Sequence, residues 1–155
     1  MRKTLAVIIV LIIFSAISPC NAEQIEDGYF KTTLPDSSIY EGYFKGGLFN
    51  GHGILVWRDG SRYAGDFKDG LKNGLYHGKG VFISHSGTRY EGEFKEGLYH
   101  GDGVFISHSG TRYEGQFKDG LPHGNGILIS SSGNIYEGKF EKGKKATKSA
   151  KSPIP

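Results

Sequence analysis

Five short stretches of the chain alternate aromatic or glycine positions with polar ones. In each, Tyr, Gly and Phe stand at positions i, i+2 and i+4, and polar or charged residues such as Glu91 and Glu93 stand between them. Successive side chains of a β-strand point to opposite faces, so this pattern predicts strands with Tyr, Gly and Phe on one face. The repeat-signature residues are Tyr40, Gly42, Phe44, Tyr63, Gly65, Phe67, Tyr90, Gly92, Phe94, Tyr113, Gly115, Phe117, Tyr136, Gly138 and Phe140.

A second apolar run follows each of the first four stretches. VFISHSGTR occurs twice, at residues 81–89 and 104–112, and its β-branched and aromatic residues predict a second strand before a Ser-Gly turn. A two-residue turn at Ser109 and Gly110 places Val104 opposite Gly115, so that Val and Ile join the Tyr and Phe face. The same register places three residues on the opposite face among Glu and Lys, as candidate partner contacts: Phe82, Phe105 and Leu128.

The two runs together form a unit that recurs along the chain. The tyrosines that begin the units are 23, 27, 23 and 23 residues apart, and the longer unit carries four extra residues, 71–74. The pattern Y-x-G-x-F-x-x-G followed by G-x-G resembles the MORN repeat family. On this resemblance, repeats span residues 40–62, 63–89, 90–112 and 113–135, with a partial repeat at 136–143 and a degenerate half repeat or cap at 23–39.

The energetics of one unit predict the architecture. Burying one Tyr, Phe, Val or Ile contributes roughly 1.5–3 kcal/mol, whereas fixing each backbone residue costs about 1–2 kcal/mol. One hairpin is therefore not stable alone, and stacked hairpins must share contacts. We expect an all-β, elongated, single-layer antiparallel meander, with Trp57 as a large cap near its N-terminal end. The 25 glycines argue against helices.

Residues 1–22 have the pattern of a signal peptide, which would form a cleavable helical segment. Arg2 and Lys3 precede an apolar run over residues 5–17, and Cys20 and Ala22 suit cleavage between Ala22 and Glu23. We expect export to the periplasm, the cell surface or the medium. The alternative is an uncleaved membrane anchor, although the run is shorter than the ~20 residues that span a bilayer.

Charge divides the mature chain into two parts. The formal charge of the whole sequence is +3, residues 23–140 carry an excess of acidic groups, and the C-terminal segment is rich in lysine. Residues 144–155 lack apolar periodicity and are expected to be a basic, disordered tail. The candidate lipid contacts are Lys142, Lys144, Lys145, Lys148 and Lys151.

The groups capable of catalysis all repeat with the unit. His77, His100 and His123 are one position copied, and copies two strands apart lie about 10 Å from each other. A catalytic or metal site needs different groups that converge on one point. The sequence therefore predicts no enzyme, no catalytic residue, no metal and no cofactor.

Binding remains as the expected activity. A single-layer sheet leaves faces and edges available, which predicts an exported protein-protein interaction scaffold or adaptor, or self-association. Alternatively, curvature makes each aromatic ladder cover itself and the repeats merely extend the molecule. The resemblance also implies association with an anionic membrane surface as an alternative function. Nucleic acid is disfavoured by the acidic body, and no small-molecule substrate is expected.

Overall fold

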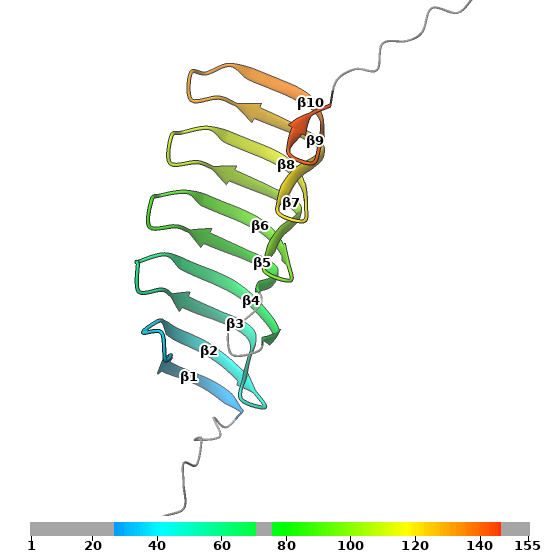
Figure 1. Cartoon of the computed structure of the whole chain (residues 1–155). Helices are drawn as coiled ribbons and strands as arrows, with labels where there is room; N and C mark the ends of the chain where they lie inside the picture. The colour runs from blue at the N-terminus through cyan, green and yellow to red at the C-terminus, as the bar shows by residue number, and fades with distance from the viewer. Residues whose placement is uncertain (1–26, 71–75, 147–155) are drawn as a thin grey trace, which may run out of the picture.

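The protein is a row of β-hairpins stacked along one axis (Figure 1). The computed structural model describes residues 27–70 and 76–146, in which eleven strands form one antiparallel sheet in sequence order. This confirms the all-β, single-layer meander. The strands are β1 (Gly28–Thr33), β2 (Ile39–Lys45), β3 (Leu48–Val56), β4 (Arg62–Gly70), β5 (Tyr76–Ile83), β6 (Arg89–Lys95), β7 (Leu98–Ile106), β8 (Arg112–Lys118), β9 (Leu121–Ile129), β10 (Ile135–Glu141) and β11 (Lys144–Lys145).

Several expectations fall outside the described residues. They are the leader at residues 1–22, the cleavage position at Ala22 and Glu23, the extra residues 71–74, and the tail residues from 147 onward, including Lys148 and Lys151. The leader and its cleavage stay predictions.

Each copy consists of a first strand with the Tyr-Gly-Phe pattern and a second strand paired beside it. The first strands are β2, β4, β6, β8 and β10. Before the first copy, β1 pairs with β2 in the same register as β3 pairs with β4. Phe30 lies opposite Gly42 of β2, and Gly53 lies at the equivalent position, opposite Gly65 of β4. At this end of the sheet, β1 thus occupies the place that the second strand of a copy occupies elsewhere.

The turn that follows each second strand differs from the expected two-residue turn. The Ser107 N–H donates to the Thr111 carbonyl at 2.8 Å, and the Gly110 N–H donates to the Ser107 carbonyl at 3.0 Å. Three residues therefore lie in the turn, and Gly110 takes a φ of +88° at its end. A three-residue loop of this kind needs a left-handed residue at its last position, which glycine adopts without a Cβ clash.

The odd turn length shifts the register by one residue and exchanges the faces. Val104 pairs with Glu114, Phe105 with Tyr113, and Gly103 with Gly115. The prediction that Val104 faces Gly115, with Val and Ile among the buried rings, is wrong. A one-residue slip moves every side chain of a strand to the other face.

The turns at the opposite ends of the strands join the first and second strands within one copy. The Gly97 N–H donates to the Tyr76 carbonyl at 3.0 Å, and the Gly120 N–H donates to the Tyr99 carbonyl at 2.9 Å. These bonds tie each turn to the copy before it. The stack is thereby held by backbone hydrogen bonds as well as by side-chain packing.

The C-terminal end differs from its prediction at two residues. Lys144 and Lys145, which the sequence assigned to a disordered tail, form β11 and pair with Glu141 and Phe140. The reason is the turn at Lys142 and Gly143, where φ is 48° and 80°. Two positive φ values at the centre of a turn are typical of a tight hairpin, so the chain returns beside β10.

Candidate functional site

The inner face of the sheet, defined here as the face that carries the signature tyrosines, is built from one motif repeated. Tyr90 is 0% exposed, and its hydroxyl donates to the Glu93 carbonyl at 2.9 Å. Its ring lies over Gly92 and over Gly103 of the next strand. A Cβ would stand 2.7 Å from the Tyr90 hydroxyl oxygen at Gly92, and 2.5 Å from it at Gly103. The glycine pair therefore makes the space that the tyrosine ring fills.

The rings form a ladder that passes from copy to copy. Tyr90 stacks on Tyr99 of the following strand with centroids 3.8 Å apart, and meets Phe117 of the next copy edge-on at 5.0 Å. Equivalent stacks join Tyr40 to Phe49 at 3.7 Å and Tyr63 to Tyr76 at 4.2 Å. Such aromatic pairs stabilise beyond their buried area by about 0.5–1.5 kcal/mol each. The sequence reasoning missed these partners, although each stands two residues before the first glycine of its G-x-G.

Burial of the ladder has an electrostatic consequence. Desolvation raises the pKa of Tyr40 to about 12, and it also raises the pKa values of Tyr63 and Tyr90. A buried phenolate would lose its hydration, so these hydroxyls stay protonated well into the alkaline range. Their role is structural: they donate to backbone carbonyls rather than to one another.

Phe82, Phe105 and Leu128 lie on the inner face, and the prediction that they lie on the opposite face is wrong. Each is partly buried and packs against the aromatic core. Phe82 joins Tyr76, Phe94, Tyr99 and a few neighbours around a shallow apolar groove of about 260 Å³. Partner contact through these three residues stays a prediction.

Trp57 does not cap the N-terminal end. It holds the same turn position as Ser84, since the Trp57 N–H donates to the Ser61 carbonyl at 2.9 Å. Its ring meets Tyr76 and Phe82 of the next copy edge-on, both at 5.9 Å. Leu34 occupies the equivalent position at the N-terminal end, so Trp57 covers the junction between two copies instead.

The outer face carries aliphatic and charged side chains in two rows that cross the strands. Ile54 is 44% exposed, Val56 36% and Ile127 37%, whereas Tyr40, Tyr63 and Tyr90 on the inner face are 0% exposed. Following the strand pairing, one row contains Val56, Arg62, Ile83, Arg89, Ile106, Arg112, Ile129 and Ile135. The other contains Ile54, Ala64, Val81, Glu91, Val104, Glu114, Ile127 and Glu137. We call these the outer-face rows.

Ion pairs join the two rows within individual strands. Arg112 Nη1 lies 2.6 Å from Glu114 Oε2, and Arg89 pairs with Glu91 in the same way. Exposed pairs of this kind contribute about 0–1 kcal/mol to stability. Their main effect is to place charge between the aliphatic side chains, which gives the outer face a mixed character.

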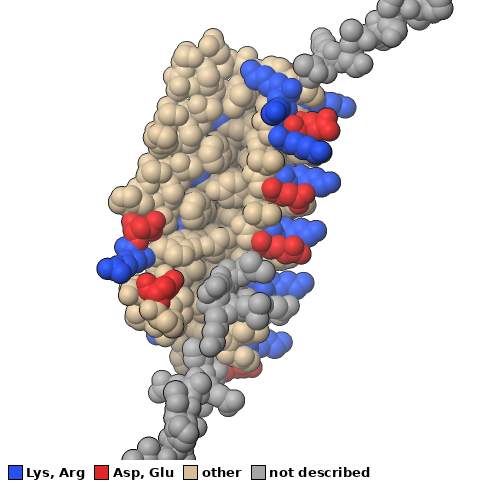
Figure 2. Space-filling view, viewed as in Figure 1, with Lys and Arg blue, Asp and Glu red and all other residues tan. Residues whose placement is uncertain are grey.

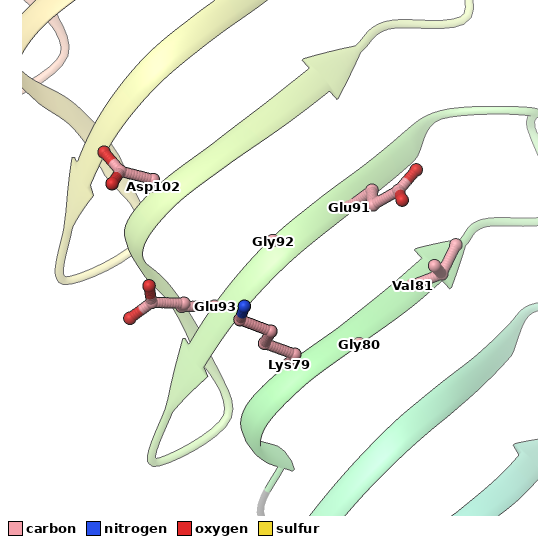
Figure 3. A pocket seen from close by; sticks show the side chains of 7 residues that line it. All are labelled: Lys79, Gly80, Val81, Glu91, Gly92, Glu93 and Asp102. Atoms are coloured by element: carbon pink, nitrogen blue, oxygen red, sulfur yellow. The ribbon is translucent and has the colours of Figure 1, made fainter.

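A shallow depression of about 470 Å³ lies on the outer face (Figure 3). It is lined by Lys79, Gly80, Val81, Glu91, Gly92, Glu93 and Asp102. The acidic side chains come from β6 and β7 and spread over the surface instead of meeting at one point. Within residues 27–70 and 76–146, no group of three or more His, Cys, Asp or Glu residues could hold a metal ion.

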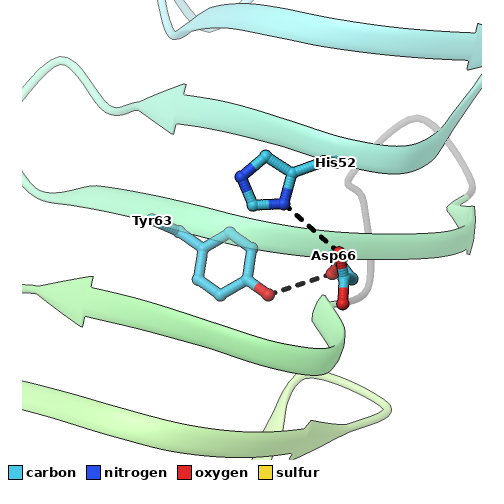
Figure 4. A network of polar contacts seen from close by, with 3 residues as sticks. All are labelled: His52, Tyr63 and Asp66. Carbon is cyan, nitrogen blue, oxygen red and sulfur yellow. Dashed lines mark hydrogen bonds and ion pairs between the residues drawn. The ribbon is translucent and has the colours of Figure 1, made fainter.

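One polar cluster has the residue types of a catalytic site (Figure 4). His52 Nδ1 lies 3.3 Å from Asp66 Oδ1, and the Tyr63 hydroxyl donates to the Asp66 backbone carbonyl at 2.9 Å. The His52 and Asp66 side chains are 70% and 51% exposed, and Tyr63 is held by the main chain, not by the carboxylate. The cluster is a surface contact between His52 and Asp66 beside a structural tyrosine.

The family model of the MORN repeat matches residues 40–62, 63–75, 71–89, 90–112 and 113–135. These matches cover more than half of the chain. The chain belongs to the MORN repeat family. MORN repeats are generally non-catalytic and are associated with binding to proteins or membranes. In the part of the chain that the structure describes, no helix is long and apolar enough to cross a membrane.

Proposed function

We propose that this MORN repeat protein is a non-catalytic scaffold that binds a protein partner through the outer-face rows. The observation that supports this most is the exposure of Ile54, Val56 and Ile127 beside a covered inner ladder. Aliphatic side chains that no layer of the sheet covers are typical of interaction surfaces. The alternation of these side chains with Arg and Glu supplies polar groups that give a partner its register.

Photo-crosslinking in the native cell tests this proposal. A photoreactive residue at Ile127 on the outer face should yield a discrete adduct with one protein. The matched control places the same residue at Ser131, an exposed turn position of the same copy, and should yield none. Equal adducts from both positions, or none from Ile127, would contradict the proposal.

We also propose that the protein acts after export, because residues 1–22 have the pattern of a cleaved leader. The mature protein should begin at Glu23. Mass spectrometry of the protein from its native cell measures this directly, and a mature chain that retains Met1 would contradict it.

Membrane-surface association is the second candidate function. Lys139, Lys142, Lys144 and Lys145 are exposed and gather at the C-terminal end of the sheet (Figure 2). Each lysine contributes about 1 kcal/mol near an anionic surface. Flotation with phosphatidylserine vesicles at low salt tests it: replacing Lys142, Lys144 and Lys145 by Gln should abolish flotation, and unchanged flotation would exclude these lysines.

A further inference from the structure

The C-terminal edge of the sheet is incompletely paired among the described residues. β9 pairs with β10 along residues 135–140, whereas β11 pairs only with Phe140 and Glu141. The Ala146 N–H donates to the Lys139 carbonyl at 2.8 Å, which shows that Lys139 faces the β11 side. Residues two apart in a strand face the same side. The backbone N–H and C=O groups of Glu137 and Ile135 therefore face this edge, where residues 27–70 and 76–146 supply no strand to pair with them.

Tyr136 shares this incomplete environment. Each earlier signature tyrosine meets the phenylalanine of the next copy edge-on, as Tyr113 meets Phe140 at 4.9 Å. Tyr136 meets Phe140 of its own strand at 5.3 Å, and Lys145 Nζ lies 4.6 Å from its ring centroid. Lys145 lies opposite Phe140 as Tyr99 lies opposite Phe94. Lys145 therefore holds the position that Tyr99, the ring that stacks on Tyr90, holds two copies earlier. Tyr136 is only partly buried.

The earlier copies show which kind of strand covers such a tyrosine. On β6, the covering strand β7 places Gly103 opposite Gly92, Val104 opposite Glu91 and Phe105 opposite Tyr90. Glycine is required at the first of these positions because the tyrosine ring fills the space of its side chain. A strand that covers Tyr136 in the same way needs Gly opposite Gly138 and a large apolar residue opposite Tyr136.

Three segments that the chain itself could supply, β1, the residues after Ala146 and β10 of a second copy, do not have this pattern. In β1, Phe30 stands where the glycine is needed, because Phe30 pairs with Gly42. In the C-terminal tail, Lys145 corresponds to Tyr99. The residue that corresponds to Gly103, four residues later, is then Ser149 and not glycine. If β10 of a second molecule paired with this edge, two Tyr136 rings would compete for the space over one pair of glycines, which only one ring can fill.

We propose that the open edge of β10 is a strand-addition site for an extended segment of another protein, with glycine opposite Gly138 and a large apolar residue opposite Tyr136. Main-chain hydrogen bonds to Ile135 and Glu137 give such a segment its affinity, and the Tyr136 ring gives it selectivity for glycine. The site uses main-chain groups at the β10 edge, whereas the proposed function uses the side chains of the outer-face rows. It therefore goes beyond the proposed function, and the two proposals can fail separately.

A peptide that copies the covering strand tests this site. The probe is a fluorescently labelled peptide with the sequence of residues 101–109. Residues 144–146 of the protein correspond to residues 98–100, so the peptide supplies the part of the covering strand that comes next. Its binding to the full-length protein is followed by fluorescence anisotropy. We expect saturable binding, and we expect a peptide with Gly103→Val to bind at least about tenfold more weakly, since its side chain meets the Tyr136 ring.

Two protein variants locate the bound peptide. Glu137→Pro removes an N–H that faces the open edge and leaves the bonds to β9, so it should abolish binding without unfolding the sheet. Glu137→Ala keeps the N–H and should therefore bind the peptide far more tightly than Glu137→Pro does. Absence of binding by the first peptide, equal binding by both peptides, or full binding by a folded Glu137→Pro variant would overturn the proposal.

Discussion

Tyr90 in the middle of the sheet and Tyr136 at its C-terminal end occupy nearly identical sequences, YEGEF and YEGKF. Both hydroxyls donate to the backbone carbonyl three residues later, at 2.9 Å for Tyr90 and 3.3 Å for Tyr136. Tyr90 is nevertheless fully buried, while Tyr136 is only partly buried. The difference is the neighbouring strand, because β7 and Phe117 cover Tyr90 and the two-residue β11 covers Tyr136.

The comparison shows that the local sequence specifies the strand and the hydroxyl contact, whereas burial comes from the next copy. This is the behaviour expected of repeat proteins, in which each unit is stabilised by its neighbours. The predictions below therefore compare middle positions with terminal ones wherever the chain offers a matched pair.

The largest expected effect is loss of the whole fold in alkali. Tyrosines ionise near pH 10 in an unfolded chain, whereas burial raises the pKa of Tyr40 to about 12 and raises that of Tyr90 as well. Above pH 10 the unfolded state loses protons that the folded state keeps, so the free energy of unfolding falls as pH rises from about 10 to 12. Tyrosinate absorbance should rise together with the loss of β-sheet circular dichroism. Ionisation of all the tyrosines near pH 10 in a folded protein would contradict this.

Next in size is truncation of a buried ring. Tyr90→Ala should lower the free energy of unfolding by about 3–5 kcal/mol, as for other buried aromatic residues. Tyr136→Ala should cost about 1 kcal/mol, because one side of that ring has little cover. Urea unfolding measures both values, and equal losses would contradict the dependence on the next strand.

A methyl group added at the glycine pair should have a smaller effect. At Gly92 a Cβ would lie 2.6 Å from the Gly103 Cα, so a backbone must move, and Gly92→Ala should cost about 1–3 kcal/mol. At Gly138 the close neighbours are atoms of the Tyr136 side chain, the nearest at 2.7 Å. That ring can turn away, so Gly138→Ala should cost less than about 1 kcal/mol in the same urea experiment. The reverse order would show that the tyrosine ring, not the neighbouring strand, sets the cost of the added methyl group.

The smallest expected effect concerns the lysine over the last ring. Lys145→Ala removes the ammonium group 4.6 Å from the Tyr136 centroid and should cost about 0.5–1 kcal/mol. Lys144→Ala is the matched control, as Lys144 belongs to the same short strand, and should change stability less. Thermal unfolding monitored by circular dichroism can compare the two, and a larger loss for Lys144→Ala would exclude the cation–π contact.

Much of the fold was predictable because the repeat carries strong local signals. The alternation of Tyr, Gly and Phe predicted β2, β4, β6, β8 and β10, and the energetics of one hairpin predicted the stacked meander. The sequence also allowed an alternative in which the aromatic ladder covers itself. The inner face agrees with that alternative, because Tyr40, Tyr63 and Tyr90 are 0% exposed. The sequence left this alternative open because self-covering depends on how strands bend and stack.

The second strands were assigned to the wrong face for an identifiable reason. Ser109 and Gly110 have the composition of a two-residue turn, but the Ser107 hydroxyl accepts a hydrogen bond from the Thr111 N–H at 3.0 Å and helps to close a three-residue turn. The turn holds three residues instead of two, and this difference of one residue places Phe105 on the inner face and Val104 on the outer face. The outer-face rows were missed as a consequence. The pairing of β11 was missed for a different reason, the tight turn at Lys142 and Gly143.

Native-state hydrogen exchange tests the central claim most directly, since it reports the free energy of opening at each amide. Glu91, Glu114 and Glu137 hold the same position in three copies, and only Glu137 lies on the open edge. We predict that the Glu91 and Glu114 amides exchange only with global unfolding, whereas the Glu137 amide exchanges orders of magnitude faster. Equal protection at all three amides would contradict the account.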